Sequence, residues 1–334
     1  MLAAGAVLLC VCCAASLVLG SRPVAPHAVW TALTTPDDSW ATAVVRGQRM
    51  PRTVLAVLVG AALGVAGALM QSLTRNPLAE PGILGVNAGA GLAVVLAVAV
   101  AGVTGVRSYV WFALGGAGLA VLGVFLLGAG GRGSRGGWGV RGGHGGPVQI
   151  ALSGVAVSAA ASSLIQTVIL SDQRAFDEFR YWSAGSIEGR RWPVLFAVLP
   201  FAALGLVLAA SVTRALNVLA LGEESARAMG VPVRLVQGSA MAAVALLSGA
   251  ATAAAGPVAF VGLGAPFLVR RLVGPDQRWV VAASVVLAPS LVLLSDIAGR
   301  LVVPGSEVPV GIMTALIGGP LFMAIARGRR LEAV

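Results

Sequence analysis

Residue types that could perform catalysis are sparse in this 334-residue chain, which has 13 acidic residues, two histidines and three cysteines. No HExxH, GxSxG or GxxxxGK[ST] pattern occurs, and no pair of carboxylates lies within an apolar run. Cys10, Cys12 and Cys13 all fall in the first apolar run, while His27 and His144 lie in separate polar segments. The sequence therefore predicts no catalytic residue, no metal site, no disulfide framework and no directly bound cofactor.

The basic residues are more informative, because all 23 are arginines and lysine is absent. Arg46, Arg49 and Arg52 stand directly before an uncharged run from Thr53 to Leu73, a position typical of residues that anchor the end of a membrane span. Asp296 is the only acid near the inside of an apolar run, and Arg300 follows it by four residues. We expect these two to form a local i,i+4 ion pair. Ion-coupled transporters place ionisable groups at membrane depth. Because such groups are scarce in the apolar runs, an ion-coupled transporter is disfavoured.

A second informative stretch is the polar segment 213–234, TRALNVLALGEESARAMGVPVR. Glu223 and Glu224 follow a glycine and suit the start of a short helix, which Gly230 and a proline would end. Its apolar side would comprise Ala226, Met229 and Val231. Such a helix could dock into a groove on a soluble partner or lie in the lipid interface.

The elements that position these residues are membrane spans. The chain is 57% hydrophobic and 11% charged, with a mean hydropathy of +0.91, whereas soluble domains are about 25% charged. The net charge of +10 is explained by arginines at span ends facing lipid headgroups. No nucleic-acid-binding module is recognisable, so the sequence predicts a polytopic membrane protein without a nucleic-acid partner.

About ten apolar runs can be delimited. We interpret residues 2–20 as the first span rather than a cleaved signal, since no basic residue precedes Arg22. The run 258–269 is too short to cross alone and is interrupted by glycines and Pro266, which predicts a broken helix buried against neighbours. The runs are at 2–20, 53–73, 83–104, 109–128, 148–170, 193–212, 235–254, 258–269, 279–298 and 309–326.

An even number of spans with both termini in the cytoplasm places 13 arginines inside and 10 outside, together the 23 in the chain. The excess of arginines on the cytoplasmic side is small, so the arginines on the outer side need another explanation. The glycine-rich segment 128–147 would be a flexible cytoplasmic loop. We treat residues 1–334 as a single transmembrane domain.

Several of these motifs together resemble the FecCD-type permease family of iron–siderophore, haem and cobalamin ABC importers. The resemblance extends from about residue 40 to 326. It is carried, in the family's order, by Arg49-Met-Pro-Arg52, Gly67-Ala-Leu-Met-Gln71, Asn76–Gly85 (NPLAEPGILG), Leu221–Gly230 (LGEESARAMG), Gly256–Pro266 (GPVAFVGLGAP), Asp296–Arg300 (DIAGR) and Glu307–Ile312 (EVPVGI). One departure is Phe267, where many relatives carry histidine, so no role is carried over for that position.

The resemblance implies an all-α polytopic fold of about ten transmembrane helices, with the architecture of a type II ABC importer permease in the cell membrane. It further implies a second permease subunit, an ATP-binding-cassette ATPase dimer that alone uses ATP, and an extracytoplasmic substrate-binding protein. The cargo would be a ferric siderophore or a related metal chelate. The segment that resembles the cytoplasmic coupling helix comprises Leu221, Gly222, Glu223, Glu224, Ala226, Arg227, Met229 and Gly230.

By the same resemblance, Arg49, Arg52 and Arg300 would face acidic residues on the binding protein, because a guanidinium can bond a carboxylate bidentately and stays charged. The alternative is that Arg49 and Arg52 only anchor a span end. Gln71, Asn87 and Gln166 are candidates for the translocation path, or else simple interhelical hydrogen-bonding residues. Two other functions remain open: an ion-coupled secondary transporter with inverted repeats, and a membrane scaffold without transport.

Overall fold

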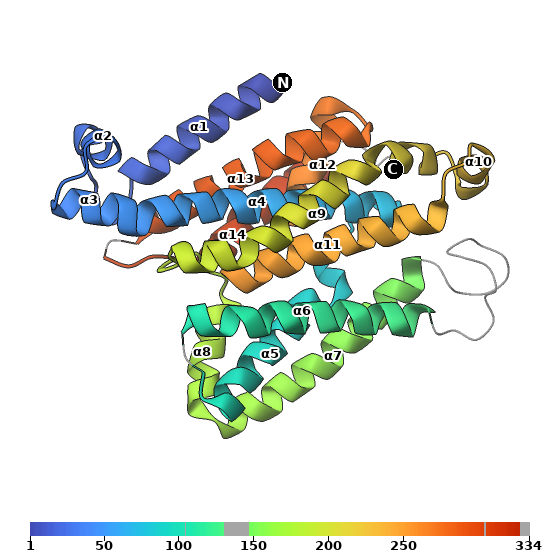
Figure 1. The fold of residues 1–334 in the computed structure, drawn as a ribbon, viewed down its shortest axis with the longest axis horizontal. Helices are drawn as coiled ribbons and strands as arrows, with labels where there is room; N and C mark the ends of the chain where they lie inside the picture. The colour runs from blue at the N-terminus through green and yellow to red at the C-terminus, as the bar shows by residue number, and fades with distance from the viewer. Residues whose placement is uncertain (104, 130–146, 304, 328–334) are drawn as a thin grey trace.

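The computed structural model describes residues 1–103, 105–129, 147–303 and 305–327 (Figure 1). These residues form helices and connections, and no strand occurs among them. The predicted loop 128–147 lies almost entirely outside the described residues. In chain order the elements are α1 (Leu2–Val18), α2 (Pro26–Thr34), α3 (Trp40–Val44), the π-helical turn η1 (Val45–Arg49), α4 (Met50–Thr74), the 3₁₀ turn η2 (Pro81–Leu84), α5 (Val86–Ala101), α6 (Val106–Ala129), α7 (Pro147–Ser171), α8 (Gln173–Ser183), α9 (Trp192–Leu219), α10 (Glu223–Ala228), α11 (Val233–Ala255), α12 (Val261–Val273), α13 (Gln277–Val302) and α14 (Val310–Arg327).

Each of the ten predicted apolar runs contains a helix, which confirms the all-α polytopic fold. Within the described part of the chain, six helical stretches are long and apolar enough to cross a membrane, and α1, α5 and the Val310–Pro320 part of α14 are shorter apolar helices. The expected short, interrupted segment is α12, a helix of 13 residues with Pro266 inside it. It extends to Val273, beyond the predicted end at residue 269.

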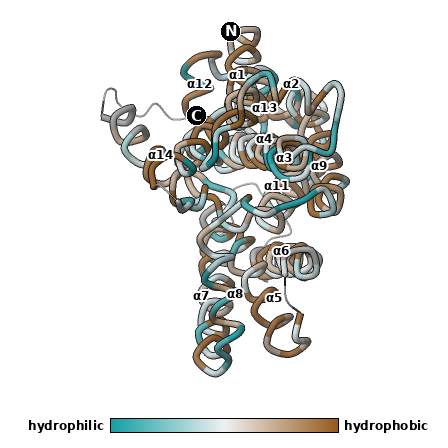
Figure 2. Tube along the Cα trace, turned by 90° about the vertical axis from the view of Figure 1, so that its left-hand side faces the viewer, coloured by the Kyte–Doolittle hydropathy of each residue, from teal (hydrophilic) through white to brown (hydrophobic). Residues whose placement is uncertain are grey.

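Two groups of helices lie side by side in Figure 1. One contains α1–α4 and α9–α14, and the other contains α5–α8. Figure 2, which looks along the helices of the first group, shows α5–α8 to one side of it. Helix α4 is the centre of the first group, since it packs against α1, α9, α11, α12 and α13 and is buried at every position from Val59 to Gln71.

The long helices have identifiable start and stop signals. Pro51 lies in the first turn of α4, directly after η1, within a helical stretch that runs without a break from Trp40 to Thr74. Helix α4 ends at Arg75, which is in the left-handed conformation with φ 51°. Helix α5 starts only at Val86, later than the apolar run predicted, because Gly85 with φ 73° turns the chain between η2 and α5.

The helix α8 was not predicted, because its sequence is polar and follows an apolar run without a break. Asp172 caps it, accepting hydrogen bonds from the backbone N–H groups of Arg174 and Ala175 at 2.8 and 3.0 Å. This capping aspartate is the signal that could have revealed the helix. Helix α8 carries Trp182, which is part of the main hydrophobic core and is 2% exposed.

Candidate functional site

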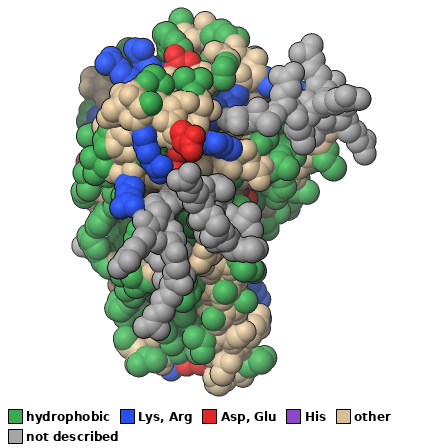
Figure 3. Space-filling model, turned by 90° about the vertical axis from the view of Figure 1, so that its right-hand side faces the viewer, with side chains coloured by type: hydrophobic (Ala, Val, Ile, Leu, Met, Phe, Trp, Pro, Cys, Tyr) green, Lys and Arg blue, Asp and Glu red, His purple; other side chains and the backbone are tan. Residues whose placement is uncertain are grey.

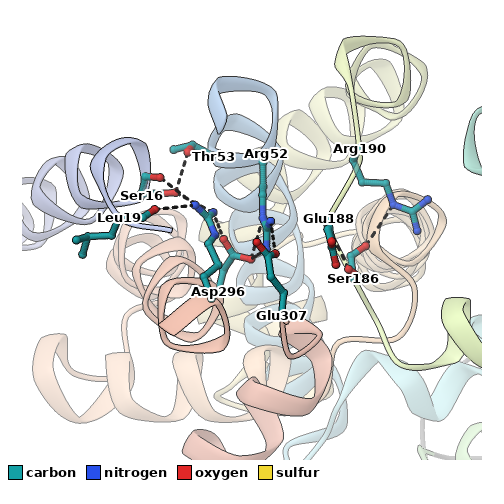
Figure 4. Close-up of polar contacts among 10 residues, drawn as sticks. Ser16, Leu19, Arg52, Thr53, Ser186, Glu188, Arg190, Asp296 and Glu307 are labelled. Carbon is teal, nitrogen blue, oxygen red and sulfur yellow. Dashed lines mark hydrogen bonds and ion pairs between the residues drawn. The ribbon is translucent and has the colours of Figure 1, made fainter. Parts of the chain in front are cut away.

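A cluster of buried charges joins α4 to α13 at the end of the molecule that carries α3 (Figure 4). The Nε and Nη2 atoms of Arg52 donate to Oδ1 of Asp296 at 3.1 and 2.7 Å. The Nη1 atom of Arg52 donates to Oε2 of Glu307 at 2.6 Å. Asp296 is 1% exposed, so its charge is compensated by protein groups alone.

Arg300 completes this cluster from the next turn of α13. It pairs with Oδ2 of Asp296, which confirms the i,i+4 pair expected from the sequence. Its Nη1 atom also donates to the carbonyl oxygens of Ser16 and Leu19 at 3.0 and 3.3 Å. Arg300 therefore fastens the C-terminal end of α1 to α13, and only 4% of it is exposed.

Arg49 is also directed into the protein. Its guanidinium donates to the carbonyl oxygens of Leu17 and Val18 at the end of α1 and of Arg22 in the following connection, which places a cation at the C-terminal end of that helix. Arg49 is 7% exposed. Its contacts fit the alternative in which this arginine only anchors the end of a span. In this conformation Arg49, Arg52 and Arg300 all donate hydrogen bonds to groups of the same chain. Their role in docking the binding protein therefore stays a prediction.

These three arginines nevertheless line a pocket of about 470 Å³, which we call the arginine pocket. Arg22, Arg190 and Arg191 line it as well, and the only carboxylates among its lining residues are Glu188 and Glu307. Asp296 pairs with Arg52 and Arg300 from behind this wall, so six cations meet three carboxylates and the pocket keeps a net positive charge. A ligand that presents carboxylates would find guanidinium donors there.

Arg190 is a member of the arginine pocket that the sequence did not single out. Its Nε donates to the carbonyl oxygen of Ser186 at 3.2 Å (Figure 4), and its Nη1 donates to the hydroxyl of Tyr109 at 3.4 Å. Burial lowers the pKa of Arg190 from its ordinary value, and the nearby Tyr109 partly opposes this shift. An arginine remains charged at neutral pH despite such a shift. No local sequence pattern marks Arg190.

A larger cavity of about 870 Å³ lies where η2, α5, α7 and α14 meet, and we call it the central cavity. Its walls are mostly small and uncharged. The lining comprises Glu80, Gly82, Ile83, Asn87, Val155, Ser158, Ala159, Ser162, Ser183, Ala184, Pro257, Ala259, Gly311, Ile312 and Ala315. Glu80 is the one carboxylate among these residues.

The three residues predicted for the translocation path are placed differently from one another. Asn87 lines the central cavity, and its Oδ1 accepts a hydrogen bond from the hydroxyl of Thr252 at 2.8 Å. Gln71 is fully buried and donates to the carbonyl oxygen of Leu263 at 3.1 Å, as the interhelical alternative expects. Gln166 is exposed on α7 and is not part of the cavity lining.

Helix α10 forms at the opposite end from the arginine pocket, as the Gly222-Glu223-Glu224 sequence predicted. Figure 3 shows acidic side chains among several basic ones on that end. The residues expected to form one apolar side of this helix differ in exposure: Ala226 is fully buried, whereas Met229 is 55% exposed. Helix α10 packs against α9 and α11, and Met229 is the residue that ends it.

The side chains that α10 offers to a partner are therefore Leu221, Glu224 and Met229, all exposed. Glu223 is engaged within the subunit instead. Its Oε2 accepts from Nη2 of Arg227 at 3.0 Å, and its Oε1 accepts from Nε2 of Gln237 at 3.2 Å. Participation of Glu223 and Arg227 in partner binding stays a prediction.

Comparison with known proteins gives a consistent result. Residues 8–328 match the model of the FecCD transport family. The chain is 39% identical over 320 residues to the ferric enterobactin transport system permease protein FepD of Escherichia coli (strain K12), covering 96% of this chain and 92% of that protein. It is 37% identical over 297 residues to the Fe(3+)-citrate import system permease protein YfmD of Bacillus subtilis (strain 168), covering 89% and 85%.

A solved structure also resembles this one over nearly its whole length. It is described as an inward-facing conformation of a metal-chelate type ABC transporter, and it superposes with a TM-score of 0.80 at 26% identity. The alignment covers 98% of this chain and 99% of that one. The sequence relatives and the structural neighbour thus agree in fold and in transporter class.

Proposed function

The chain belongs to the FecCD transport family of multi-pass membrane permeases, and from this premise we propose that it imports a ferric siderophore or a related metal chelate. The observation that carries the proposal is the central cavity, placed between the arginine pocket at one end and α10 at the other. Its wall of small, largely uncharged residues suits passage of a bulky ligand without tight binding. Hydrolysis of ATP is the task of a separate ATPase.

A second permease subunit completes the translocation path. Val155, Ala159, Ser162 and Ile312 line the central cavity yet are exposed in the single chain, so one wall of the path is missing. A second copy or a sister subunit packed against α7 and α14 would supply it. The permease pair would then exchange between inward- and outward-facing states. A ligand shifts the populations of these two states only by binding one of them more tightly than the other.

The end with the arginine pocket faces outward and α10 faces the cytoplasm in this proposal. Helix α1 runs opposite to α4, because Ser16 near its C-terminal end bonds to Thr53 near the start of α4 at 2.8 Å. Residue 1 therefore lies toward the cytoplasmic side. Helix α14 likewise leads away from the outer Glu307, so this proposal assigns both termini to the cytoplasm.

The arginine pocket receives acidic side chains of an extracytoplasmic binding protein. Arg49, Arg52 and Arg300 form its buried part, while Arg22 and Arg191 are exposed at its rim. Rim charges mainly accelerate association, and their effect is reduced by salt. This favours Arg22 and Arg191 as test positions, because changing the buried arginines would also disturb the fold.

Replacing Arg22 and Arg191 together with glutamate should weaken binding-protein affinity about ten-fold, mainly through slower association. Surface plasmon resonance with the permease in nanodiscs, at low and high salt, measures this effect. Arg174→Glu is the matched control, because Arg174 is exposed on α8 and does not line the pocket. Equal association rates for the double variant and the control would refute docking at this pocket.

The α10 segment binds the ATPase through its exposed apolar residues. Replacing Leu221 and Met229 with aspartate places charges where a groove would bury these side chains, so copurification of the ATPase should be lost. Val302→Asp is the control, because Val302 is similarly exposed at the opposite end of the molecule. Full copurification with the Leu221/Met229 variant would show that α10 is not the main contact.

A further inference from the structure

Helix α11 is held by side-chain hydrogen bonds near both of its ends, and these bonds connect α10 to the central cavity. We propose that α11 transmits movement of α10 to the cavity wall, with Gln237 and Thr252 as the positioning residues at its two ends. This inference rests on the proposed docking of the ATPase at α10. It adds the route by which that docking reaches the translocation path.

The first connection lies at the α10 end. Nε2 of Gln237, one turn into α11, donates to Oε1 of Glu223 at 3.2 Å. Gln237 is 5% exposed, so water does not readily replace this bond. The backbone N–H of Val231 also donates to the carbonyl oxygen of Ala226 at 2.9 Å. A displacement of α10 is therefore expected either to move the start of α11 or to break the part-buried hydrogen bond between Gln237 and Glu223.

The second connection lies at the cavity end. The hydroxyl of Thr252 donates to Oδ1 of Asn87 at 2.8 Å, and Asn87 lines the central cavity. The carbonyl oxygen of Ala255, the last residue of α11, accepts from the backbone N–H of Ser186 at 2.7 Å. Just beyond the helix, Pro257 is itself part of the cavity lining. The end of α11 is thus bonded to two separate segments and continues directly into the cavity wall.

Between these connections α11 is built as a stiff element. Gln237 and Thr252 are 15 positions apart, a rise of about 22 Å along a helix. Helix α11 has no internal proline, which would weaken or kink it, whereas α9, α12, α13 and α14 each contain one. It contains two Gly/Ser pairs, Gly238-Ser239 and Ser248-Gly249, and helices can also bend at such pairs. The second pair is fully buried, so the surrounding helices restrain bending there. Residues 247–256 are all buried against neighbouring helices. Movement at one end is therefore passed along the helix rather than absorbed by a bend.

Physical contact alone does not establish coupling, so the test must measure it. The complete importer, with its ATPase and binding protein, is reconstituted in liposomes. A cysteine at Ile312, which lines the cavity and is 43% exposed, reports cavity accessibility through its rate of maleimide labelling with and without ATP. The native cysteines at positions 10, 12 and 13 are replaced by alanine in all variants.

Thr252→Val and Gln237→Leu should each reduce the ATP-driven change in labelling about five-fold, while copurification and hydrolysis by the ATPase persist. The double variant should be no worse than either single variant, because both interrupt one route. Thr252→Ser should restore the response. Ser248→Ala is the matched control, since the Ser248 hydroxyl is buried on the same helix but donates at 2.6 Å only to the carbonyl of Val244, within α11.

Three results would overturn the proposal: a normal labelling response in Thr252→Val, a double variant whose defects multiply, or a Ser248→Ala defect equal to that of Thr252→Val. A failure of the proposed ATPase docking at α10 would give a different result from these three. In that case the Leu221/Met229 aspartate variant would still copurify with the ATPase and respond to ATP, whatever the effect at Thr252.

Discussion

Asp296→Asn is expected to destabilise the folded permease by about 3–5 kcal/mol, because it removes the shared anion from a buried charge cluster. The substitution keeps the shape of the side chain but leaves Arg300 without a carboxylate partner among the described residues. Arg52 would keep only Glu307. Thermal unfolding in detergent or nanodiscs, followed by intrinsic fluorescence, measures the loss.

A surface pair in the same chain provides the control for this prediction. Asp177 and Arg180 lie 3.7 Å apart and both are about half exposed, so Asp177→Asn should change stability little. Adding Arg300→Met to Asp296→Asn should recover part of the loss, since the unpaired cation is then removed. Equal unfolding temperatures for Asp296→Asn and the parent protein would refute the importance of the cluster.

Gly67→Val is expected to produce the second large effect, a loss of about 3 kcal/mol at the upper end of overpacking costs. A Cβ at Gly67 would lie 1.7 Å from the carbonyl oxygen of Gly262 and 2.9 Å from its Cα. These obstructing atoms are backbone, so no side-chain rotation relieves the clash. Helices α4 and α12 would have to separate, which would also strain the bond between Gln71 and the carbonyl of Leu263.

The loss should appear both as a lower unfolding temperature and as reduced uptake in cells that depend on this importer. Gly264→Ala is the control on α12, because a Cβ there meets no atom within 4 Å, and alanine is the better helix former. A Gly67→Val protein with normal yield and unfolding temperature would show that the two helices can separate without cost.

Much of this protein follows from the order of its residues. The ten apolar runs each contain a helix because lipid leaves backbone polar groups no other partner than the same segment. The Asp296–Arg300 pair was predictable because a four-residue spacing places both side chains on one helix face. The helix after Gly222 followed from local start and stop signals, and motif order was sufficient to identify the family.

Only the tertiary structure decided how these parts combine. Arg52 meets Asp296 and Glu307 across more than 240 positions of chain, and no local pattern encodes such a distance. Arg49 proved to bond the end of α1, Gln166 lies outside the cavity lining, and Arg190 joined the arginine pocket without any sequence signal. Side-chain burial and long-range contact depend on which helices pack together, whereas helix formation in a membrane depends mainly on each segment's own composition.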